Sequence, residues 1–182
     1  MVTFRIDDEI TLREFREGDA AAVFTTVSAN YEHLHSFMDW ITPDYSIGSA
    51  KEFIVKSIKG REERTNLSLG IFRGSRFIGS IGFTYFDWAA MKTEMGYWIA
   101  AADEGKGIVY KAAALLIDFA IRELRINRIE IRCSAENQRS SAIPVRLGFK
   151  KEGHLRRSEF RNGRLHDFEI YGLLASEWES GG

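Results

Sequence analysis

The stretch EMGYWIAAADEGKGIVYKAA, residues 94–113, decides the fold of this chain. An apolar run that ends at Ala100 is typical of a strand, and a polar segment separates it from an amphipathic run that begins at Ile108. Gly105 and Gly107 let the backbone curl, so that several N–H groups point at one spot where the helix N-terminus adds partial positive charge. The pattern predicts a strand, an anion-binding loop and a helix, unless the two glycines only permit a tight turn.

Two other phosphate-binding motifs are excluded. A Walker loop requires Gly, four residues and then Gly-Lys-Ser/Thr, which the sequence does not contain. A Rossmann fingerprint requires a third glycine at position 110, which is a tyrosine here, and a first strand near the start of the unit. Nicotinamide chemistry is therefore not expected.

The composition bounds the class of protein. The chain has 182 residues, 45% hydrophobic and 28% charged, with two prolines, so we expect a single domain over residues 1–182. One cysteine and four scattered histidines give neither an internal disulfide nor metal-ligand spacing, so no metal is expected. The N-terminus lacks a signal-peptide pattern and the longest apolar stretch, residues 112–121, is too short to cross a bilayer. A cytoplasmic protein with no membrane partner is predicted.

The charge is unevenly distributed along the chain. Between Arg122 and Arg164 there are twelve Lys or Arg against five Asp or Glu, although the whole chain carries a net charge of −1. Such a local excess favours a small anionic ligand over a nucleic-acid track, so no direct nucleic-acid binding is expected. The alternative is that these arginines lie on solvated helix and strand faces.

Strands and helices are predicted on both sides of the central unit. Apolar alternation predicts strands at residues 10–15, 67–72, 77–86, 94–100, 128–134, 149–160 and 165–174. Helical spacing predicts helices after a cap at Asp19, around Leu34, Phe37 and Trp40, from Ser49, from Ile108 to about residue 125, and over 139–147 before Gly148. Together these elements predict an α/β (α+β) fold: one mixed, mostly antiparallel sheet of about seven strands with helices on both faces.

A second constellation, AENQRSSAIPVRLGF, covers residues 135–149. Asn137 ends a strand and can bind amide-like groups, and Ser140 follows one turn later. With the central unit, this segment resembles the GCN5-related N-acetyltransferase (GNAT) superfamily, and within it the RimL/RimJ type, the ribosomal-protein N-terminal acetyltransferases. The resemblance extends from about Ile10 to Trp178 and rests on Leu34-x-x-Phe37-x-x-Trp40, Glu94-x-Gly96-Tyr97-Trp98-Ile99, Gly105-Lys106-Gly107, Cys133, Asn137-x-x-Ser140, Leu147-Gly148-Phe149 and Asn162-Gly163-x-x-x-Asp167.

The resemblance implies direct transfer of acetyl from acetyl-CoA, as co-substrate, to an amine. Pantetheine would pair with the backbone of the strand that holds Tyr97, Trp98 and Ile99, and an N–H there would stabilise the oxyanion. Asn137 would bond the pantetheine arm, with Ser140 nearby. The pyrophosphate would lie on the N–H groups of Glu104, Gly105, Lys106, Gly107 and Ile108.

The resemblance also suggests the groups that move protons. It implies Glu159 as the general base, with Glu94 as the rival, and Ser140 as the general acid because Pro144 stands where many relatives have a tyrosine. Plainer roles remain open: Glu159 as a surface partner of Arg157 or Arg161, Glu94 as a strand-start residue, and Ser140 as a helix N-cap. A second departure, Ala102 in place of Gln or Arg, puts one side-chain contact to the co-substrate in doubt.

The acceptor follows from amine chemistry and from the family. An α-amine with a pKa of about 7.7–8.0 is far more often neutral at pH 7 than a lysine, so a protein N-terminus is the expected acceptor. The alternatives are a polyamine or aminoglycoside acceptor, or a CoA-binding regulator without catalysis. Leu34, Phe37, Trp40, Tyr85 and Phe86 are candidates to line the acceptor pocket. Cys133 is expected to be an inert core thiol, although the resemblance leaves open a mixed disulfide with CoA, and a homodimer is plausible.

Overall fold

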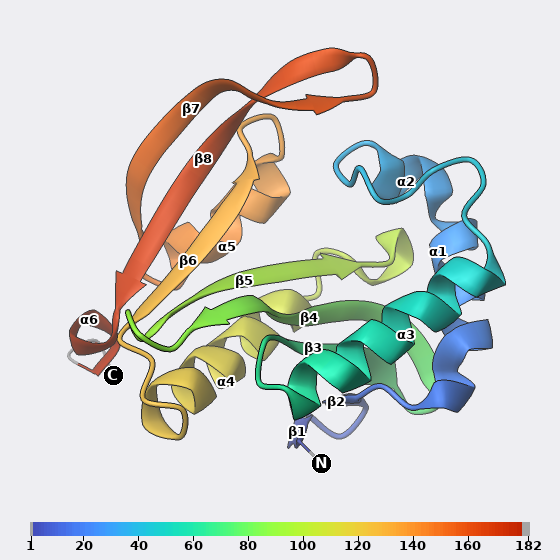
Figure 1. Cartoon of the computed structure of the whole chain (residues 1–182), viewed down its shortest axis with the longest axis horizontal. Coiled ribbons are helices and arrows are strands. Elements are labelled where there is room, and N and C mark those ends of the chain that lie inside the picture. The colour runs from blue at the N-terminus through green and yellow to red at the C-terminus, as the bar shows by residue number, and fades with distance from the viewer. Residues whose placement is uncertain (1, 180–182) are drawn as a thin grey trace.

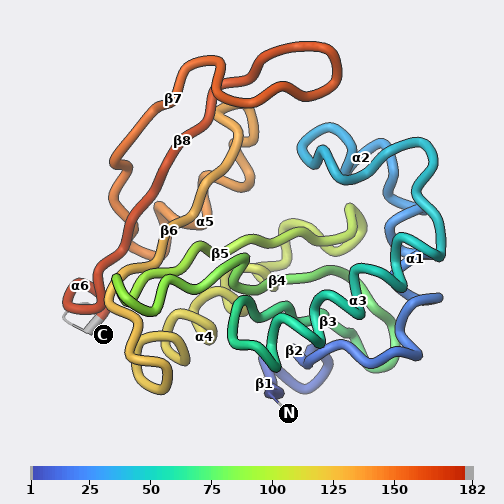
Figure 2. Tube along the Cα trace, viewed as in Figure 1, coloured from blue at the N-terminus to red at the C-terminus, as the bar shows by residue number. Residues whose placement is uncertain are grey.

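The computed structural model describes residues 2–179, which form one curved sheet with helices on both faces (Figures 1 and 2). Helices α1 (Ala20–Ala29) and α3 (Ile47–Glu62) cover one face, and α4 (Ile108–Arg122) and α5 (Gln138–Arg146) cover the other. The strand order is β1-β2-β3-β4-β5-β6-β8-β7. The strands are β1 (Thr3–Arg5), β2 (Ile10–Glu14), β3 (Leu67–Arg73), β4 (Arg76–Asp87), β5 (Lys92–Ile99), β6 (Arg128–Ser134), β7 (Lys150–Arg161) and β8 (Arg164–Leu174). Shorter elements are α2 (Tyr31–His35), α6 (Ala175–Glu179) and the 3-10 turns η1 (Glu17–Asp19) and η2 (Ala101–Asp103).

Strands β5 and β6 are the parallel pair in an otherwise antiparallel sheet. The crossover helix α4 joins them, as parallel pairing requires. Their ladder runs only from Lys92 opposite Arg128 to Glu94 opposite Glu130. Beyond that point the two strands diverge, which opens the sheet at its centre (Figure 1).

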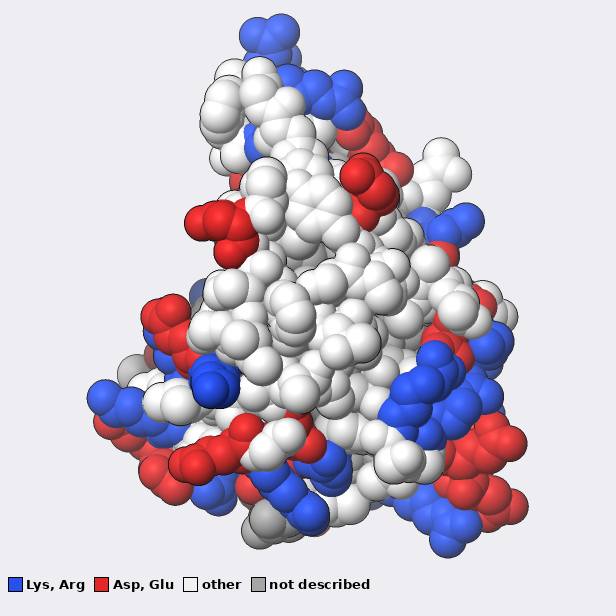
Figure 3. Space-filling view, turned by 90° about the vertical axis from the view of Figure 1, so that its right-hand side faces the viewer, with Lys and Arg blue, Asp and Glu red and all other residues white. Residues whose placement is uncertain are grey.

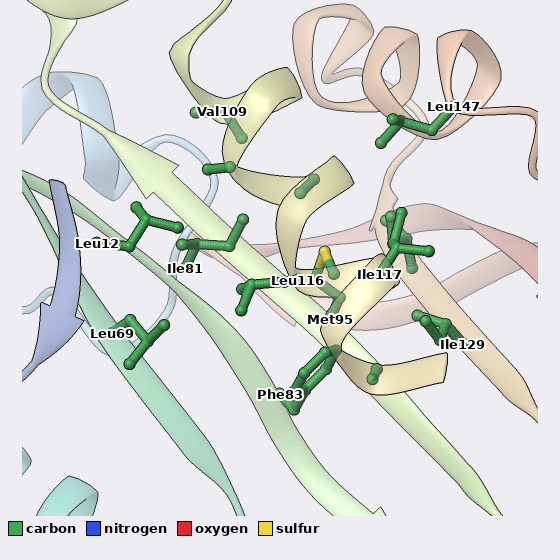
Figure 4. Packing of buried hydrophobic residues seen from close by; sticks show 14 of the residues in the cluster. Leu12, Leu69, Ile81, Phe83, Met95, Val109, Leu116, Ile117, Ile129 and Leu147 are labelled. Atoms are coloured by element: carbon green, nitrogen blue, oxygen red, sulfur yellow. The ribbon is translucent and has the colours of Figure 1, made fainter. Parts of the chain in front are cut away.

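Two apolar clusters hold the helices on the sheet. On one face, Leu116 and Ile117 point from α4 toward Met95 and Ile129, and all four are at most 1% exposed (Figure 4). On the other face, the second cluster joins α1 and α3 to β3 and β4. Each fully buried Leu or Ile contributes about 1.5–3 kcal/mol relative to an exposed one. The rigid packing around β5 fixes the position of the opening beside it.

The strand predictions are confirmed, with one addition. Strand β1 pairs antiparallel with β2, which makes eight strands instead of about seven. It is three residues long, too short for its alternation to be recognised in the sequence.

Three local predictions were wrong in detail. The helix expected around Phe37 and Trp40 ends at His35, and a turn follows it in which the N–H groups of Phe37 and Met38 both donate to the carbonyl of Leu34. Helix α3 begins at Ile47, because Ser46 is its cap. Asp19 stands before α1, but its carboxylate accepts from the N–H of Arg16 at 2.8 Å and so does not cap that helix.

Candidate active site

The open edge of β5 is the first component of the site. Its other edge pairs with β4 from Asp87 opposite Lys92 to Gly79 opposite Ile99, so only the edge facing β6 lacks a partner beyond Glu94. Unpaired strand backbone is a template for an extended ligand with amide groups. Tyr97, Trp98 and Ile99, all expected at the co-substrate site, line a cavity of about 640 Å³ along this edge.

The glycine loop lies at one end of the same cavity. Gly105 and Gly107 have φ angles of 72° and 73°, a left-handed conformation that other residues adopt only with strain. Within residues 2–179, the N–H groups of residues 105–108 donate no hydrogen bond, as expected where a helix begins. Glu104, Gly105, Gly107 and Ile108 line the cavity. The loop can therefore present free N–H donors to a phosphate group.

A buried carboxylate fixes the loop from behind. Asp103 is 1% exposed and accepts from Arg73 at 3.0 Å, Arg76 at 2.8 Å and Lys106 at 3.0 Å. Burial acts to raise the pKa of Asp103, but Lys106, Arg76 and Arg73 hold it below its usual range. The ammonium group of Lys106 is thus bound away from the cavity, and this residue offers the loop only its backbone.

Replacing Asp103 with asparagine is expected to lower the free energy of unfolding by about 2–3 kcal/mol at pH 7, since three cationic groups lose their charged acceptor. Because the folded-state pKa is lowered, this stabilisation is complete above the unfolded value of about 3.9 and is lost as the pH falls through the folded value. Urea unfolding at pH 7 and pH 3 measures the difference, and Asp8→Asn, at an exposed surface pair, is the control. An unchanged midpoint at pH 7 would contradict the role of Asp103.

The start of α5 brings Ser140 to the opening between the strands. Asn137 is the cap of α5, since its Oδ1 accepts from the N–H of Ser140 at 3.1 Å. The possibility that Ser140 caps this helix is therefore wrong: Ser140 is the third helical residue. Its hydroxyl lies 3.5 Å from the Tyr97 hydroxyl, which itself donates to the Ser140 carbonyl at 2.9 Å.

The hydroxyl of Tyr97 was not anticipated, because the sequence assigned this residue a role only through its backbone. Burial raises the pKa of Tyr97 well above its usual value, so the phenol remains protonated and can act as a donor. Burial likewise raises the pKa of the Cys133 thiol to about 11. This thiol is 5% exposed, which fits the expected unreactive core residue at neutral pH.

A second cavity, of about 530 Å³, lies on the α1 and α3 side of the sheet. It meets the first where β5 and β6 separate, and both cavities are lined by Phe37, Met38, Tyr97, Trp98, Asn137 and Ser140. The ring of Trp40 lies 6.3 Å from that of Trp98 and 6.0 Å from that of Tyr45, giving the second cavity an aromatic wall. Of the anticipated pocket residues, Leu34 lines the first cavity, while Tyr85 and Phe86 line neither.

The two candidate bases lie near this second cavity but do not line it. Burial raises the pKa of Glu94, and Glu130 and Glu159 add to the effect. Burial, with a contribution from Asp39, also raises the pKa of Glu159. Neither carboxylate forms a hydrogen bond or ion pair with the described residues, so the expected alternative of an ion pair from Glu159 to Arg157 or Arg161 is absent. Both groups remain free to accept a proton.

The end of the β7–β8 hairpin is tied to the chain around α2. Arg161, 3% exposed, donates to the carbonyl of Phe37 at 3.0 Å, and Asn162 donates to that of His35 at 3.1 Å. These bonds hold the strand that bears Glu159 beside the wall of the second cavity. Figure 3 shows the face that carries α2 and the hairpin end: it is largely uncharged across its middle, with basic side chains at the hairpin end.

Among residues 2–179 no group of three His, Cys, Asp or Glu side chains is placed to hold a metal ion. No helix in that range is long and apolar enough to cross a membrane.

Comparisons with known proteins identify the arrangement. A family model described as an acetyltransferase (GNAT) domain matches residues 9–150. YdaF of Bacillus subtilis (strain 168), provisionally designated a ribosomal N-acetyltransferase, is 32% identical over 180 residues, with 98% of each chain covered.

Two solved structures share the fold. The microcin C7 self-immunity acetyltransferase MccE, in complex with acetyl-CoA and AMP, is 29% identical with a TM-score of 0.87, over 93% of this chain and 94% of that one. RimL, a ribosomal L7/L12 α-N-protein acetyltransferase in complex with coenzyme A, is 24% identical with a TM-score of 0.91, over 95% and 98% of the two chains. At that identity the likeness to RimL establishes the fold, and the expected architecture is confirmed.

Proposed function

This chain belongs to the GNAT acetyltransferase family and is an acetyl-CoA-dependent N-acetyltransferase, and we propose that its acceptor is the N-terminal α-amine of a protein, as in the ribosomal type. The observation that supports the proposal most directly is the pair of cavities that meet where β5 and β6 separate. The first cavity has the unpaired edge of β5, which suits pantetheine, and the glycine loop with free N–H groups, which suits the pyrophosphate. The other offers aromatic walls and nearby carboxylates to an incoming ammonium group.

On the donor side, we assign pantetheine to the backbone of Tyr97, Trp98 and Ile99 and the pyrophosphate to the N–H groups of residues 105–108. The N–H of Glu104, which was also expected there, instead donates to the carbonyl of Ala101 at 3.3 Å. The side-chain amide of Asn137 keeps its N–H donors for pantetheine, since only its oxygen is used by the helix cap. An N–H of β5 near Tyr97 or Trp98 would stabilise the oxyanion as the amine adds to the thioester carbonyl. The thioester carbon then lies close to Ser140, at the junction of the two cavities.

On the acceptor side, we assign proton removal to Glu159, with Glu94 as the second candidate. The acceptor arrives as an ammonium ion, and the carboxylate takes one proton, directly or through water, to free the lone pair that attacks. When the C–S bond breaks, the amine loses its second proton and the sulfur gains one. We assign protonation of the leaving thiolate to the hydroxyl of Ser140, which lies 3.5 Å from that of Tyr97.

The choice of a protein N-terminus rests on amine chemistry as well as on relatives. An α-amine is roughly a tenth neutral at pH 7, and a lysine is below a thousandth, so the same base achieves more with an α-amine. RimL, which shares the fold of this chain, is a ribosomal L7/L12 α-N-protein acetyltransferase. A homodimer, a cytoplasmic location, a single domain and the absence of direct nucleic-acid binding stay predictions.

The first experiment measures acetyl-CoA consumption with a panel of acceptors. It contains peptides with free Ser, Ala or Met N-termini, the same peptides with a blocked N-terminus and an internal lysine, spermidine and an aminoglycoside. We expect turnover only with free N-termini. Turnover confined to spermidine or the aminoglycoside would overturn the proposed acceptor, and tight CoA binding without any turnover would favour a regulatory protein.

A further inference from the structure

Arg132 is an arginine without a partner beside the acceptor cavity. It lies on β6, is exposed, and lines the second cavity together with Cys133 and Ser134. Its guanidinium forms no hydrogen bond or ion pair within residues 2–179. Other arginines near the two cavities are engaged: Arg139 pairs with Glu104, and Arg161 donates to the Phe37 carbonyl.

The position of Arg132 relative to the candidate bases is specific. Glu130, two residues before Arg132 on the same face of β6, lies opposite Glu94 of β5. The charge of Arg132 acts to lower the pKa of both Glu94 and Glu159. Strand alternation puts Arg132 on the same face of β6 as Glu130, but Glu130 is already bound by Arg128 at 2.8 Å. Arg132 is thus an exposed guanidinium without a partner among the described residues, in the lining of the second cavity and next in sequence to Cys133.

A guanidinium group has five N–H donors and no acceptor, so a ligand that Arg132 binds in this cavity must supply a hydrogen-bond acceptor such as an oxygen atom. An α-amine carries such an oxygen close by, because its α-carbon is bonded directly to a carbonyl group. A polyamine nitrogen and a lysine side-chain amine have no carbonyl at that distance. A carboxylate and a guanidinium beside one cavity match the two polar ends of an α-amino acyl group: the carboxylate meets the ammonium, and the guanidinium meets the carbonyl oxygen.

We propose that Arg132 donates hydrogen bonds to the carbonyl oxygen of the acceptor's first residue, and that this contact selects α-amino acyl acceptors over other amines. The inference rests on the proposed function and deepens it by naming what the site recognises. In this arrangement the rings of Trp40 and Trp98 lie beside the side chain of the acceptor's first residue.

The test compares an Ala-initiated peptide with its analogue in which sulfur replaces the first carbonyl oxygen, a much weaker hydrogen-bond acceptor. For the wild-type chain, we expect kcat/KM to be about 10- to 100-fold lower with the thioamide peptide. For Arg132→Met, we expect kcat/KM with the amide peptide to fall by the same 10- to 100-fold, while kcat/KM with the thioamide peptide changes less than about threefold. Because an altered base affects both peptides equally, the ratio isolates the carbonyl contact.

Two further variants complete the experiment. Arg132→Gln keeps an N–H donor and should retain part of the discrimination, and Arg125→Met, at an exposed arginine after α4, should retain all of it. Equal kcat/KM for both peptides in the wild type, or an equal loss for both in Arg132→Met, would overturn the role of Arg132. Failure of the wild type to acetylate any free N-terminus would instead overturn the proposed function.

Discussion

Replacing Glu159 with glutamine should lower kcat with an N-terminal peptide at least 100-fold at pH 7, at saturating acetyl-CoA. A positioned base contributes about 10²- to 10⁴-fold, and glutamine keeps the shape of the side chain without its proton affinity. The raised pKa makes Glu159 a stronger base than an ordinary glutamate. The rate of CoA release, measured in samples quenched at set times, gives the change in kcat.

The pH dependence supplies the control for this prediction. Wild-type activity should fall as the pH drops through the raised pKa of Glu159, because the carboxylate is then protonated. The deficit of Glu159→Gln should shrink as the pH rises past the amine pKa of about 7.7–8.0, where the acceptor is already neutral. Glu94→Gln should lower kcat less than tenfold. Glu123→Gln, at the distant end of α4, should leave kcat unchanged. A larger loss in Glu94→Gln than in Glu159→Gln would transfer the role of base to Glu94.

Removing the hydroxyls of Ser140 and Tyr97 together should give the second large effect, about a 100-fold fall in kcat. Ser140→Ala and Tyr97→Phe alone should each lower kcat only about threefold, because either hydroxyl can protonate the thiolate in the absence of the other, so the product of the single losses stays well below the loss in the double variant. Since the two groups lie 3.5 Å apart, their effects should not be independent. A full kinetic cycle of the four proteins measures the coupling.

Stability measurements separate this catalytic role from a structural one. Because Asn137 caps α5, Ser140→Ala should change the free energy of unfolding by less than about 0.5 kcal/mol. Asn137→Ala, which removes the cap, should cost about 1 kcal/mol. Ser140→Asp tests the donor, because an ionised carboxylate has no proton to give. Full activity of Ser140→Asp would show that the hydroxyl of Ser140 is not the acid.

The sequence revealed most where the chemistry is local. Residues 94–113 predicted a strand, a glycine loop and a helix, because alternation, left-handed glycines and helical periodicity are properties of neighbouring residues. Asn137-x-x-Ser140 was found for the same reason. The spacing of Leu34, Phe37 and Trp40 misled, since apolar side chains three apart also arise where a loop lines a cavity, and here the turn after His35 breaks the helix.

The excess of basic residues between Arg122 and Arg164 shows how tertiary contacts alter such an interpretation. Several of these side chains pair with carboxylates, including Arg128 with Glu130 and Glu152, and Arg164 with Glu136. The loop that we propose for the anionic ligand lies at the start of α4, outside this stretch, and offers backbone N–H groups. Net charge along a chain does not reveal which charges are already paired in space.

By itself the sequence determined the architecture and the glycine loop, because both depend on short-range backbone preferences, and the resemblance of its motifs indicated the family. Only the tertiary structure decided that Tyr97 meets Ser140, that Asp103 is held by Arg73 and Arg76, and that Arg132 lines the second cavity without a partner among residues 2–179. The contacts at the site arise because β5 diverges from β6 after three residue pairs. It brings side chains that are distant in the sequence to one opening, and their partners and protonation are set by burial there.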